Sequence, residues 1–453
     1  MTHGAMRLAA LATALMAAPA QADRTEAPLS VLKAKGIITE QEYQALLKEV
    51  DAEVARRAAA SADDRLVRRT ESGVGVVVGD VTLKLSGSVN AFFVHDNAEE
   101  PGPGTAVVGG LASVGENTAA VRNGLLPGFF RIDVTTTQGG WDVGAHVGFY
   151  PGINSVDYVG GANSAGNPQA LGTAGIDARQ TFLTVARQGL GELKLGRDIG
   201  LFASEAILND MTLLGVGTPA GNVAPSNTTL GRIGLGYIYT DFQPQITYTT
   251  PKFAGLRASV GIFQPLRTVG RPGEQKGSPG LQGKITWDFG AAEGLSGRLW
   301  LSGITQKHGD SAPNLDDDYR GSAFDVGARL GVAGASLVGY YYRGSGVGTT
   351  GLFIFPVDAA GNRRDSSGYY LQGFYTLGKL FLGASYGRSS LDLADGEVNP
   401  LLVRFNASWA GQVRYGLTSW VSLVAEYVRT RARAHGGNEA KSDALAIGSI
   451  LFF

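Results

Sequence analysis

The sequence predicts an all-β protein, a sixteen-stranded antiparallel β-barrel that crosses a membrane. Glycine is very frequent, with 66 residues, and aromatic and β-branched residues recur in short runs that alternate with polar ones. The connections between these runs are alternately short and long, and the runs are even in number, as in outer-membrane barrels. Because lipid offers no hydrogen-bonding partner to a sheet edge, strands of this kind must close into a barrel.

The alternation assigns the strands and their faces. In 128–138, Phe130, Ile132 and Val134 share the outward face and leave Arg131 and Asp133 in the lumen. The expected strands are 81–95, 128–138, 141–151, 177–188, 192–198, 244–251, 256–264, 281–289, 297–307, 322–332, 335–343, 367–377, 379–389, 401–414, 420–433 and 442–453.

Composition and charge exclude several classes of protein. The formal net charge is −1, so the chain lacks the basic footprint of nucleic-acid binding. Cysteine is absent, which excludes disulfides, thiol catalysis and cysteine-bound metals. No stretch approaches the roughly 20 apolar residues that a transmembrane helix needs, so a membrane role must use strands.

The N-terminus predicts a secretory signal peptide over 1–22. Arg7 precedes an apolar run, and the small residues Ala20 and Ala22 mark cleavage after Ala22. The alternative is a short buried helix. With this peptide removed, a periplasmic helical segment over 23–72 precedes the barrel at 73–453.

The segment 23–72 contains a predicted amphipathic helix. Thr39 and Glu42 form a capping box, and Tyr43, Leu46 and Val50 fall on one face behind it. The segment is equally suited to a short coiled coil that joins subunits and to a helix that docks under the next domain.

A long irregular segment follows the strand that ends at Asp198. Alternation stops there for over thirty residues, far more than a hairpin needs. Phe202, Ile207 and Leu213 within it must be buried somewhere. We therefore expect this loop to fold back into the barrel and narrow its lumen.

The residues around this loop resemble trimeric Gram-negative porins. The run Arg179-Gln180-Thr181-Phe182, followed by Gly191 to Asp198 (GELKLGRD), matches their Arg-x-x-Phe and Gly-x-x-x-x-Gly-Arg-Asp pattern. The resemblance covers about 74–453. It departs at Ile199-Gly200-Leu201-Phe202, where the family has an acidic-aromatic motif, and at the helical segment 23–72.

The resemblance implies a function, a location and partners. It implies an outer-membrane homotrimer that lets small hydrophilic solutes diffuse passively through a water-filled pore, surrounded by outer-membrane lipid and lipopolysaccharide. A substrate-selective porin for anions or small organic acids is the alternative.

The resemblance also implies a constriction in which wall bases oppose loop acids. It places Lys84, Arg131 and Arg179 on the wall and Glu205 and Asp210 on the loop. Alternation independently puts Lys84 and Arg131 inside and is ambiguous for Arg179. Opposed charges across a narrow pore orient dipolar solutes. The alternative for each is a solvated residue far from the narrowest point.

Further charges on lumen-facing positions give a slight basic excess. The pore-lining set comprises Asp133, Lys194, Arg257, Lys284, Arg298 and Arg404. The other lumen-facing charges are Arg329, Asp142, Glu192, Asp288, Asp325 and Glu426. With the constriction bases, this makes nine bases against six acids on the wall, a mild anion preference that the two loop acids nearly cancel.

Arg197 is expected at a subunit interface. It shares the outward face with Leu193 and Leu195, where an arginine in mid-bilayer costs roughly 2–4 kcal/mol. A neighbouring subunit that pairs with it removes this cost, and snorkelling to the membrane surface is the alternative.

Other signals are weaker. Gly346 to Gly351 formally matches a dinucleotide fingerprint but lacks the helix that should follow, so we expect no cofactor. The histidines lack metal-ligand spacing, and Asp316-Asp317-Asp318 fits a solvated loop better than a divalent-cation site. A barrel enzyme would need a histidine with a catalytic partner, and only His146 lies mid-strand facing the lumen, with none evident.

Overall fold

The structure is a computed structural model. It describes residues 31–33, 35–36, 38–64, 67–70, 72–153, 176–219, 228–290, 294–313 and 315–453. The predicted signal peptide lies outside these residues. The chain divides into two compact units, 1–71 with 76–82 and 72–75 with 83–453.

The first unit contains the expected capped helix. Helix α3 spans Glu40–Asp64, and its capping box is formed: the Glu42 amide donates to Thr39 Oγ1 at 3.2 Å, and the Thr39 amide donates to Glu42 Oε2 at 2.8 Å. After it, β1 (Val67–Arg69) pairs antiparallel with β2 (Val74–Val78). None of the helices in the described residues is long and apolar enough to cross a bilayer.

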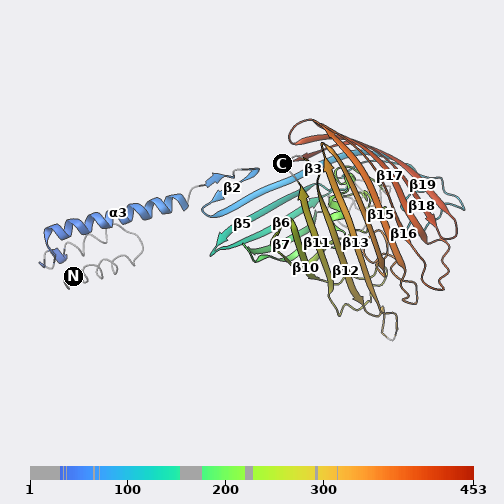
Figure 1. Ribbon diagram of the computed structural model, residues 1–453, viewed down its shortest axis with the longest axis horizontal. Coiled ribbons are helices and arrows are strands. Elements are labelled where there is room, and N and C mark those ends of the chain that lie inside the picture. Colours follow the sequence, from blue (N-terminus) through green and yellow to red (C-terminus); the bar gives the residue numbers. More distant parts are fainter. Residues whose placement is uncertain are drawn as a thin grey trace, which may run out of the picture. The chain divides into compact units, whose positions relative to one another are not determined.

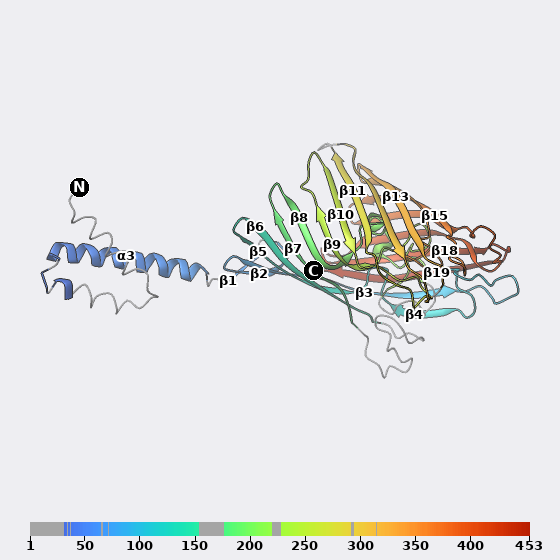
Figure 2. The same ribbon diagram turned by 90° about the horizontal axis from the view of Figure 1, so that it is seen from below.

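The second unit is a closed antiparallel barrel (Figures 1 and 2). All sixteen predicted strands are confirmed in order, with ends shifted by a few residues. They are β3 (Val81–Asn97), β5 (Phe129–Gln138), β6 (Trp141–Pro151), β7 (Ile176–Arg187), β8 (Gly191–Ile199), β9 (Phe242–Thr249), β10 (Leu256–Phe263), β11 (Gly280–Gly290), β12 (Ser296–His308), β13 (Tyr319–Val332), β14 (Ala335–Ser345), β15 (Asp365–Leu377), β16 (Leu380–Leu391), β17 (Val403–Gly416), β18 (Val421–Ala434) and β19 (Glu439–Phe452).

The seam of the barrel joins the first of these strands to the last. β19 pairs antiparallel with β3, with Ile450 opposite Asn90 and Phe452 opposite Ser88. A short additional strand, β4 (Thr118–Arg122), pairs with the outer part of β3. The hydrogen-bonded ladder therefore runs without a free edge around the barrel.

Short turns close one end of the barrel. Gly139 and Gly140 join β5 to β6 with φ of 58° and 78°, the left-handed pair that a two-residue hairpin requires. The opposite end carries the long loops. Along the strands the faces alternate as predicted: on β18, Val424, Glu426 and Val428 are buried inside the barrel while Tyr427 is exposed outside.

The long segment after β8 folds back into the barrel, as predicted (Figure 1). It contains α4 (Ser204–Leu208) and the 3₁₀ helix η1 (Met211–Leu214). Its apolar side chains join inward-facing aromatic residues of the strands in one core, which includes Phe202, Ile207, Tyr340 and Tyr370. The apolar residues of the loop are therefore buried, as the sequence predicts.

Candidate functional site: the charged lumen

The inner wall has two parts, which we name by what covers them. The covered arc is the inward face of β11 to β18, against which the loop lies. Backbone amides of the loop donate to its side chains: Leu201 to Gln282 Oε1 at 2.8 Å, Ala203 to Asp325 Oδ2 at 2.7 Å. The open arc is the inward face of β5 to β8, whose polar side chains keep access to the lumen.

The far end of the loop is fixed to the covered arc in the same way. The Met211 amide donates to Gln372 Oε1 at 3.0 Å, and the Val216 amide donates to Glu426 Oε1 at 3.1 Å. Gly217, with φ of 61°, also donates to Glu426. Because a β-carbon at Gly217 would lie 2.2 Å from Gly231 Cα, only glycine fits this close approach.

Glu205, the first predicted loop acid, faces bases of the covered arc. From α4 it accepts from Lys284 Nζ at 3.0 Å and from Arg298 Nη1 at 3.2 Å. Arg298 also pairs with Asp288 at 2.6 Å. The loop acid and wall bases thus meet on β11 and β12, away from the arginines that the resemblance placed opposite the loop.

Asp210, the second predicted loop acid, is an internal anchor of the loop. It caps η1 by accepting from the Thr212 amide at 2.9 Å, and it accepts from the Tyr237 hydroxyl at 3.0 Å. Burial raises the pKa of the Asp210 carboxyl, an effect that the fully buried Arg232 guanidinium opposes. Arg232 itself donates to the Ser408 carbonyl at 3.3 Å.

Arg131 lies on the open arc with about a third of its side chain exposed. It pairs with Asp133 at 2.8 Å, and Asp133 also contacts His146 Nδ1. The His146 ring stacks on Phe182 with centroids 4.6 Å apart. Lys194 Nζ lies 4.9 Å from the same Phe182 ring. Bases and acids therefore alternate along this wall.

Lys194 extends this network toward the long-loop end. It pairs with Asp198, which also accepts from Gln180 Nε2 at 2.8 Å. Gln180 in turn accepts from the Tyr150 hydroxyl. This continuous network holds the polar side chains of the open arc in place.

Arg179 lies beside a β-bulge, where β7 has one residue more than its partner between the pairs Gly148–Gln180 and Tyr150–Asp177. The bulge is why alternation alone could not orient it. Its guanidinium pairs with Asp177 at 2.7 Å and lies 4.8 Å from the Tyr150 ring, and its side chain is only 13% exposed. Arg179 therefore has its own acid and lies less open to the lumen than Arg131.

Three other predicted residues form no ion pair within the described part of the chain. Lys84 is exposed on β3 and precedes Ser88, the residue of that strand opposite the end of β19. Arg404 is the extra residue of a bulge at the start of β17, is exposed, and so falls outside the regular inward series. Arg197 faces outward near the long-loop end of β8 and donates to the Phe242 carbonyl at 2.5 Å.

Bases collect in the half of the lumen nearer the short turns. Arg257 and Arg329 are exposed on the inward faces of β10 and β13, close along the wall to Arg298. Arg414 on β17, which was not predicted, lies 3.7 Å from the Phe381 ring. Within the described part of the chain, Arg257, Arg329 and Arg414 form no ion pair.

Most interior acids are buried, whereas the interior bases divide into fully buried ones, Arg122 and Arg232, and partly exposed ones. Arg298 is 40% exposed and Arg131 32%. The buried interior acids are Asp96, Asp198, Glu205, Asp210, Asp325 and Glu426. Asp142, Glu192 and Asp288 keep exposure, but all three lie near the short-turn rim.

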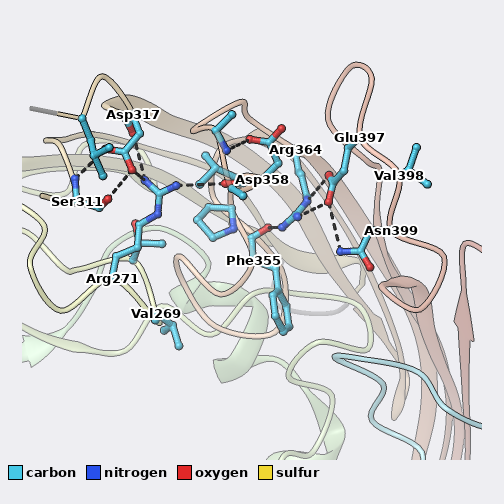
Figure 3. Close-up of a pocket in the computed structure, with 17 residues that line it drawn as sticks. Val269, Arg271, Ser311, Asp317, Phe355, Asp358, Arg364, Glu397, Val398 and Asn399 are labelled. Carbon is cyan, nitrogen blue, oxygen red and sulfur yellow. Dashed lines mark hydrogen bonds and ion pairs between the residues drawn. The ribbon is translucent and has the colours of Figure 1, made fainter.

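At the long-loop end, a cavity of about 680 Å³ forms an outer vestibule (Figure 3). Arg271 pairs with Asp317 at 3.0 Å, and Arg364 pairs with Glu397. Hydrogen bonds from Ser311 are the main cause of the lowered pKa of Asp317, and Arg271 contributes less. The Arg364 guanidinium is the main cause that holds the pKa of Glu397 at about 2. Each base has an acid, and the further lining acid Asp358 leaves the vestibule with three acids against two bases.

The acidic run 316–318 lies beside this vestibule. Asp317 turns to Arg271, whereas Asp316 and Asp318 approach Asp310, with carboxylates within 4.8 Å of one another. Lys307 offsets part of this charge by pairing with Asp318 at 3.2 Å.

Sequence reasoning missed Arg232, Asp198 and Arg414. Arg232 lies in the loop, where no alternation exists to assign a face. Asp198 and Arg414 lie close to the ends of their strands. Both occupy inward positions that alternation could have assigned. Asp198 pairs with Lys194 of its own strand and accepts from Gln180 of β7, whereas Arg414 contacts Phe381 of β16.

A closed barrel with an apolar-cored loop across its lumen and a charged, partly exposed inner wall is the architecture of an outer-membrane channel. The sequence profile described as Gram-negative porin matches residues 8–436, so this chain belongs to the Gram-negative porin family. It is an outer-membrane channel for the passive diffusion of small hydrophilic solutes. The family and fold are those of a channel rather than an enzyme.

Solved structures share this fold at low sequence identity. The outer-membrane channel DcaP of Acinetobacter baumannii is 16% identical, covers 85% of this chain and 99% of its own, with a TM-score of 0.60. An anion-selective porin from Comamonas acidovorans is 15% identical over 82% and 100%, with a TM-score of 0.55. Salmonella typhi OmpF in complex with daunomycin is 13% identical over 84% and 100%, with a TM-score of 0.52. None of the curated protein sequences matches this chain.

Proposed function

We propose that solutes pass along the open arc, between it and the inward surface of the loop. The hydrogen bonds of the loop to Gln282, Asp325, Gln372 and Glu426 hold it against the covered arc. This placement is the observation that carries the proposal, because it leaves the partly exposed network around Arg131 and Lys194 beside the free lumen.

The predicted constriction residues have different roles in the pore. Arg131, Asp133 and Lys194 line the path directly. Glu205 acts through Lys284 and Arg298, and Asp210 holds the loop in shape. Arg179 lies beside the path, and Lys84 lies beyond the end of β19. These roles follow from exposure and partners rather than from the resemblance alone.

A planar-bilayer recording tests whether the protein forms a channel and how wide a range of solutes it admits. Purified protein should give stable conductance steps in salt, and small neutral sugars and organic acids should pass without blocking them at low concentration. A conductance that one solute blocks at low concentration would instead establish the substrate-selective alternative. Absence of conductance would refute the channel altogether.

Anion preference is the second candidate, and the unequal exposure of charges favours it. The exposed bases Arg257, Arg298 and Arg329 set the local potential, whereas most interior acids are buried. The likeness in fold to an anion-selective porin is compatible with this preference.

Reversal potentials in a salt gradient test this preference. The wild-type channel should favour chloride over potassium, and Arg257→Gln with Arg329→Gln should reduce or reverse that preference. The control, Thr286→Ser, lies opposite Arg257 in the ladder and alters the same wall without changing charge. A cation-selective wild type, or a double variant with unchanged reversal potential, would contradict the proposal.

We also propose a homotrimer, on the basis of family membership. If the segment 23–72 assembles subunits, its deletion should weaken the trimer on a non-heated gel while the channel stays conductive. A trimer of unchanged resistance to heat would assign the segment to docking or to a periplasmic partner instead.

A further inference from the structure

One histidine lies on the wall of the proposed path. His95 is exposed on an outward position of β3, His308 is fully buried at the long-loop end of β12, and His435 follows the end of β18. His146 differs from these three, because it occupies an inward position in the middle of β6 and its side chain is 12% exposed. Among the described histidines, it is therefore the one placed to exchange a proton with the water of the lumen.

The contacts of the His146 ring determine which nitrogen carries its proton. Nδ1 lies 2.5 Å from Asp133 Oδ1, and an ionised carboxylate can only accept, so Nδ1 carries the hydrogen. Nε2 lies 3.2 Å from Thr184 Oγ1 and accepts from that hydroxyl. Since a hydroxyl oxygen also accepts, a second proton on Nε2 can be donated to the same oxygen. The imidazole and the imidazolium therefore fit one arrangement, and protonation requires no movement of the wall.

The neighbouring strands hold this ring in place. In the ladder, Asp133, His146 and Phe182 stand opposite one another on β5, β6 and β7. The imidazole stacks on the Phe182 ring with centroids 4.6 Å apart. Gly144, the preceding inward position, leaves the space in which Nε2 meets Thr184, because a β-carbon there would lie 2.6 Å from Nε2 and 2.8 Å from the hydroxyl oxygen. Three strands therefore keep the imidazole in one orientation.

The charged groups that face His146 balance one another. On β5, Arg131 pairs with the same Asp133 oxygen at 2.8 Å, and its Nη2 lies 3.4 Å from His146 Nδ1. The residues of β7 that contact the imidazole are uncharged. On β8, Lys194 lies 4.9 Å from the centroid of the phenyl ring on which the imidazole stacks, and it pairs with Asp198 at 2.5 Å. Two bases thus face two acids, and a proton on His146 adds an unbalanced charge.

The remaining charges of the open arc lie farther along the wall. Arg179 pairs with Asp177 at 2.7 Å, and Asp142 and Glu192 lie near the short-turn rim. Of the residue types on this wall, histidine is the one that ordinarily changes charge between about pH 5 and 8. Within that range, His146 therefore decides how the charge of the path varies.

We propose that His146 makes the ion selectivity of the channel depend on pH. With a neutral imidazole, the bases and acids around it cancel. With an imidazolium, the path gains one positive charge, which attracts anions and repels cations. The anion preference should therefore rise as the pH falls from about 8 to about 5. This role of His146 rests on the proposed path along the open arc.

The test is the reversal potential in a potassium chloride gradient across a planar bilayer, measured at about pH 8 and about pH 5.5. Salt near 0.1 M keeps the Debye length at about 10 Å, so a charge on the wall is only partly screened. The wild type should raise its chloride-to-potassium permeability ratio about two- to fivefold at the lower pH. His146→Gln should lose this rise. His146→Lys, with a permanent charge, should show at the higher pH the ratio that the wild type reaches at the lower pH.

The matched control is His95→Gln, which removes a histidine that faces outward on β3. It should keep the full rise. The buried acids Asp325 and Glu426 are present in every variant, so the difference between wild type and His146→Gln reports His146 alone. If the glutamine variant does not refold, His146→Asn places a neutral amide at the same position, and the same loss is expected.

Several results would overturn the proposal. They are a rise of wild-type size in His146→Gln, a wild-type ratio that does not change with pH, and an equal loss of the rise in His95→Gln. Arg131→Gln separates this role from the proposed function. A shift of selectivity in Arg131→Gln, with no effect of His146→Gln, would keep the path along the open arc and refute the role of His146. Absence of conductance would refute both.

Discussion

The open and covered arcs of the lumen differ in what their charges face. On the open arc, Arg131 and Lys194 have acidic partners yet keep contact with the lumen. On the covered arc, Asp325 and Glu426 accept hydrogen bonds from loop amides and are buried. The charges of the open arc face solutes, whereas the acids of the covered arc hold a loop and only some of its bases, such as Arg298, stay exposed.

This difference shows that a count of lumen charges is a poor guide to the field that a solute meets. Equal numbers of bases and acids act unequally when the acids are buried under backbone amides that offset their charge. Three of the four predictions below test the division between the arcs, and the one on Glu397 tests the vestibule. They run from the largest expected effect to the smallest.

Gly217→Val should release the loop from the covered arc. Valine in the left-handed region costs about 1–2 kcal/mol, and the clash with Gly231 adds to this cost. We expect a larger single-channel conductance and faster proteolysis of the loop. The matched control is Gly411→Val, a strand position with open space around its β-carbon. A wild-type conductance in Gly217→Val would show that the loop does not set the pore size.

Arg131→Gln should shift selectivity toward cations more than Arg179→Gln does. A unit charge near the path changes an ion's energy by about 1 kcal/mol in water, roughly a fivefold change in permeability ratio at most. Arg179 is less exposed and has its own partner in Asp177, so its effect should be smaller. Reversal potentials measure the shift in each variant. Equal shifts, or a larger shift in Arg179→Gln, would place the path nearer Arg179.

Glu397→Gln should loosen the vestibule in a pH-dependent way. The Arg364 guanidinium depresses the pKa of Glu397 from 4.5 to about 2, so its stabilisation is complete above about pH 4.5 and is lost as the pH falls through 2. At pH 7 the variant should lose about 1–3 kcal/mol of local loop stability. Hydrogen exchange of the loop amides measures this, and the difference from wild type should vanish near pH 2. A difference that persists there would point to packing rather than charge.

Lys84→Gln should leave conductance and selectivity unchanged. The residue is exposed and lies beyond the end of β19. Recordings under the conditions used for Arg131→Gln provide the comparison. A shift as large as that of Arg131→Gln would return Lys84 to the constriction.

The fold could be predicted from the sequence because its signals are local. Alternation with period two, tight glycine turns and the long break after Asp198 gave sixteen strands and an inward loop, which the structure has. The faces of Arg131, Lys194 and Lys284 follow from the same alternation.

The site was harder to predict because its geometry depends on pairing between distant segments. Alternation gives a face but not a level along the barrel axis, which the stagger of the strands sets, and Lys84 illustrates this. A single inserted residue reverses the face, as at the bulges beside Arg179 and at Arg404. The contact of Glu205 with Lys284 and Arg298 joins a loop to two later strands, and no spacing in the sequence encodes it.

The seam between β3 and β19 has a consequence for assembly. Every other neighbouring pair of the sixteen barrel strands is consecutive in the chain and joined by a turn or a loop. Each such pair can therefore form as a hairpin independently of the others. The seam alone unites segments from opposite ends of the barrel sequence, and its closure carries the largest cost in chain entropy. Until it closes, the nascent sheet has two unsatisfied edges that can recruit other chains. Productive insertion therefore depends on shielding those two strands until they meet.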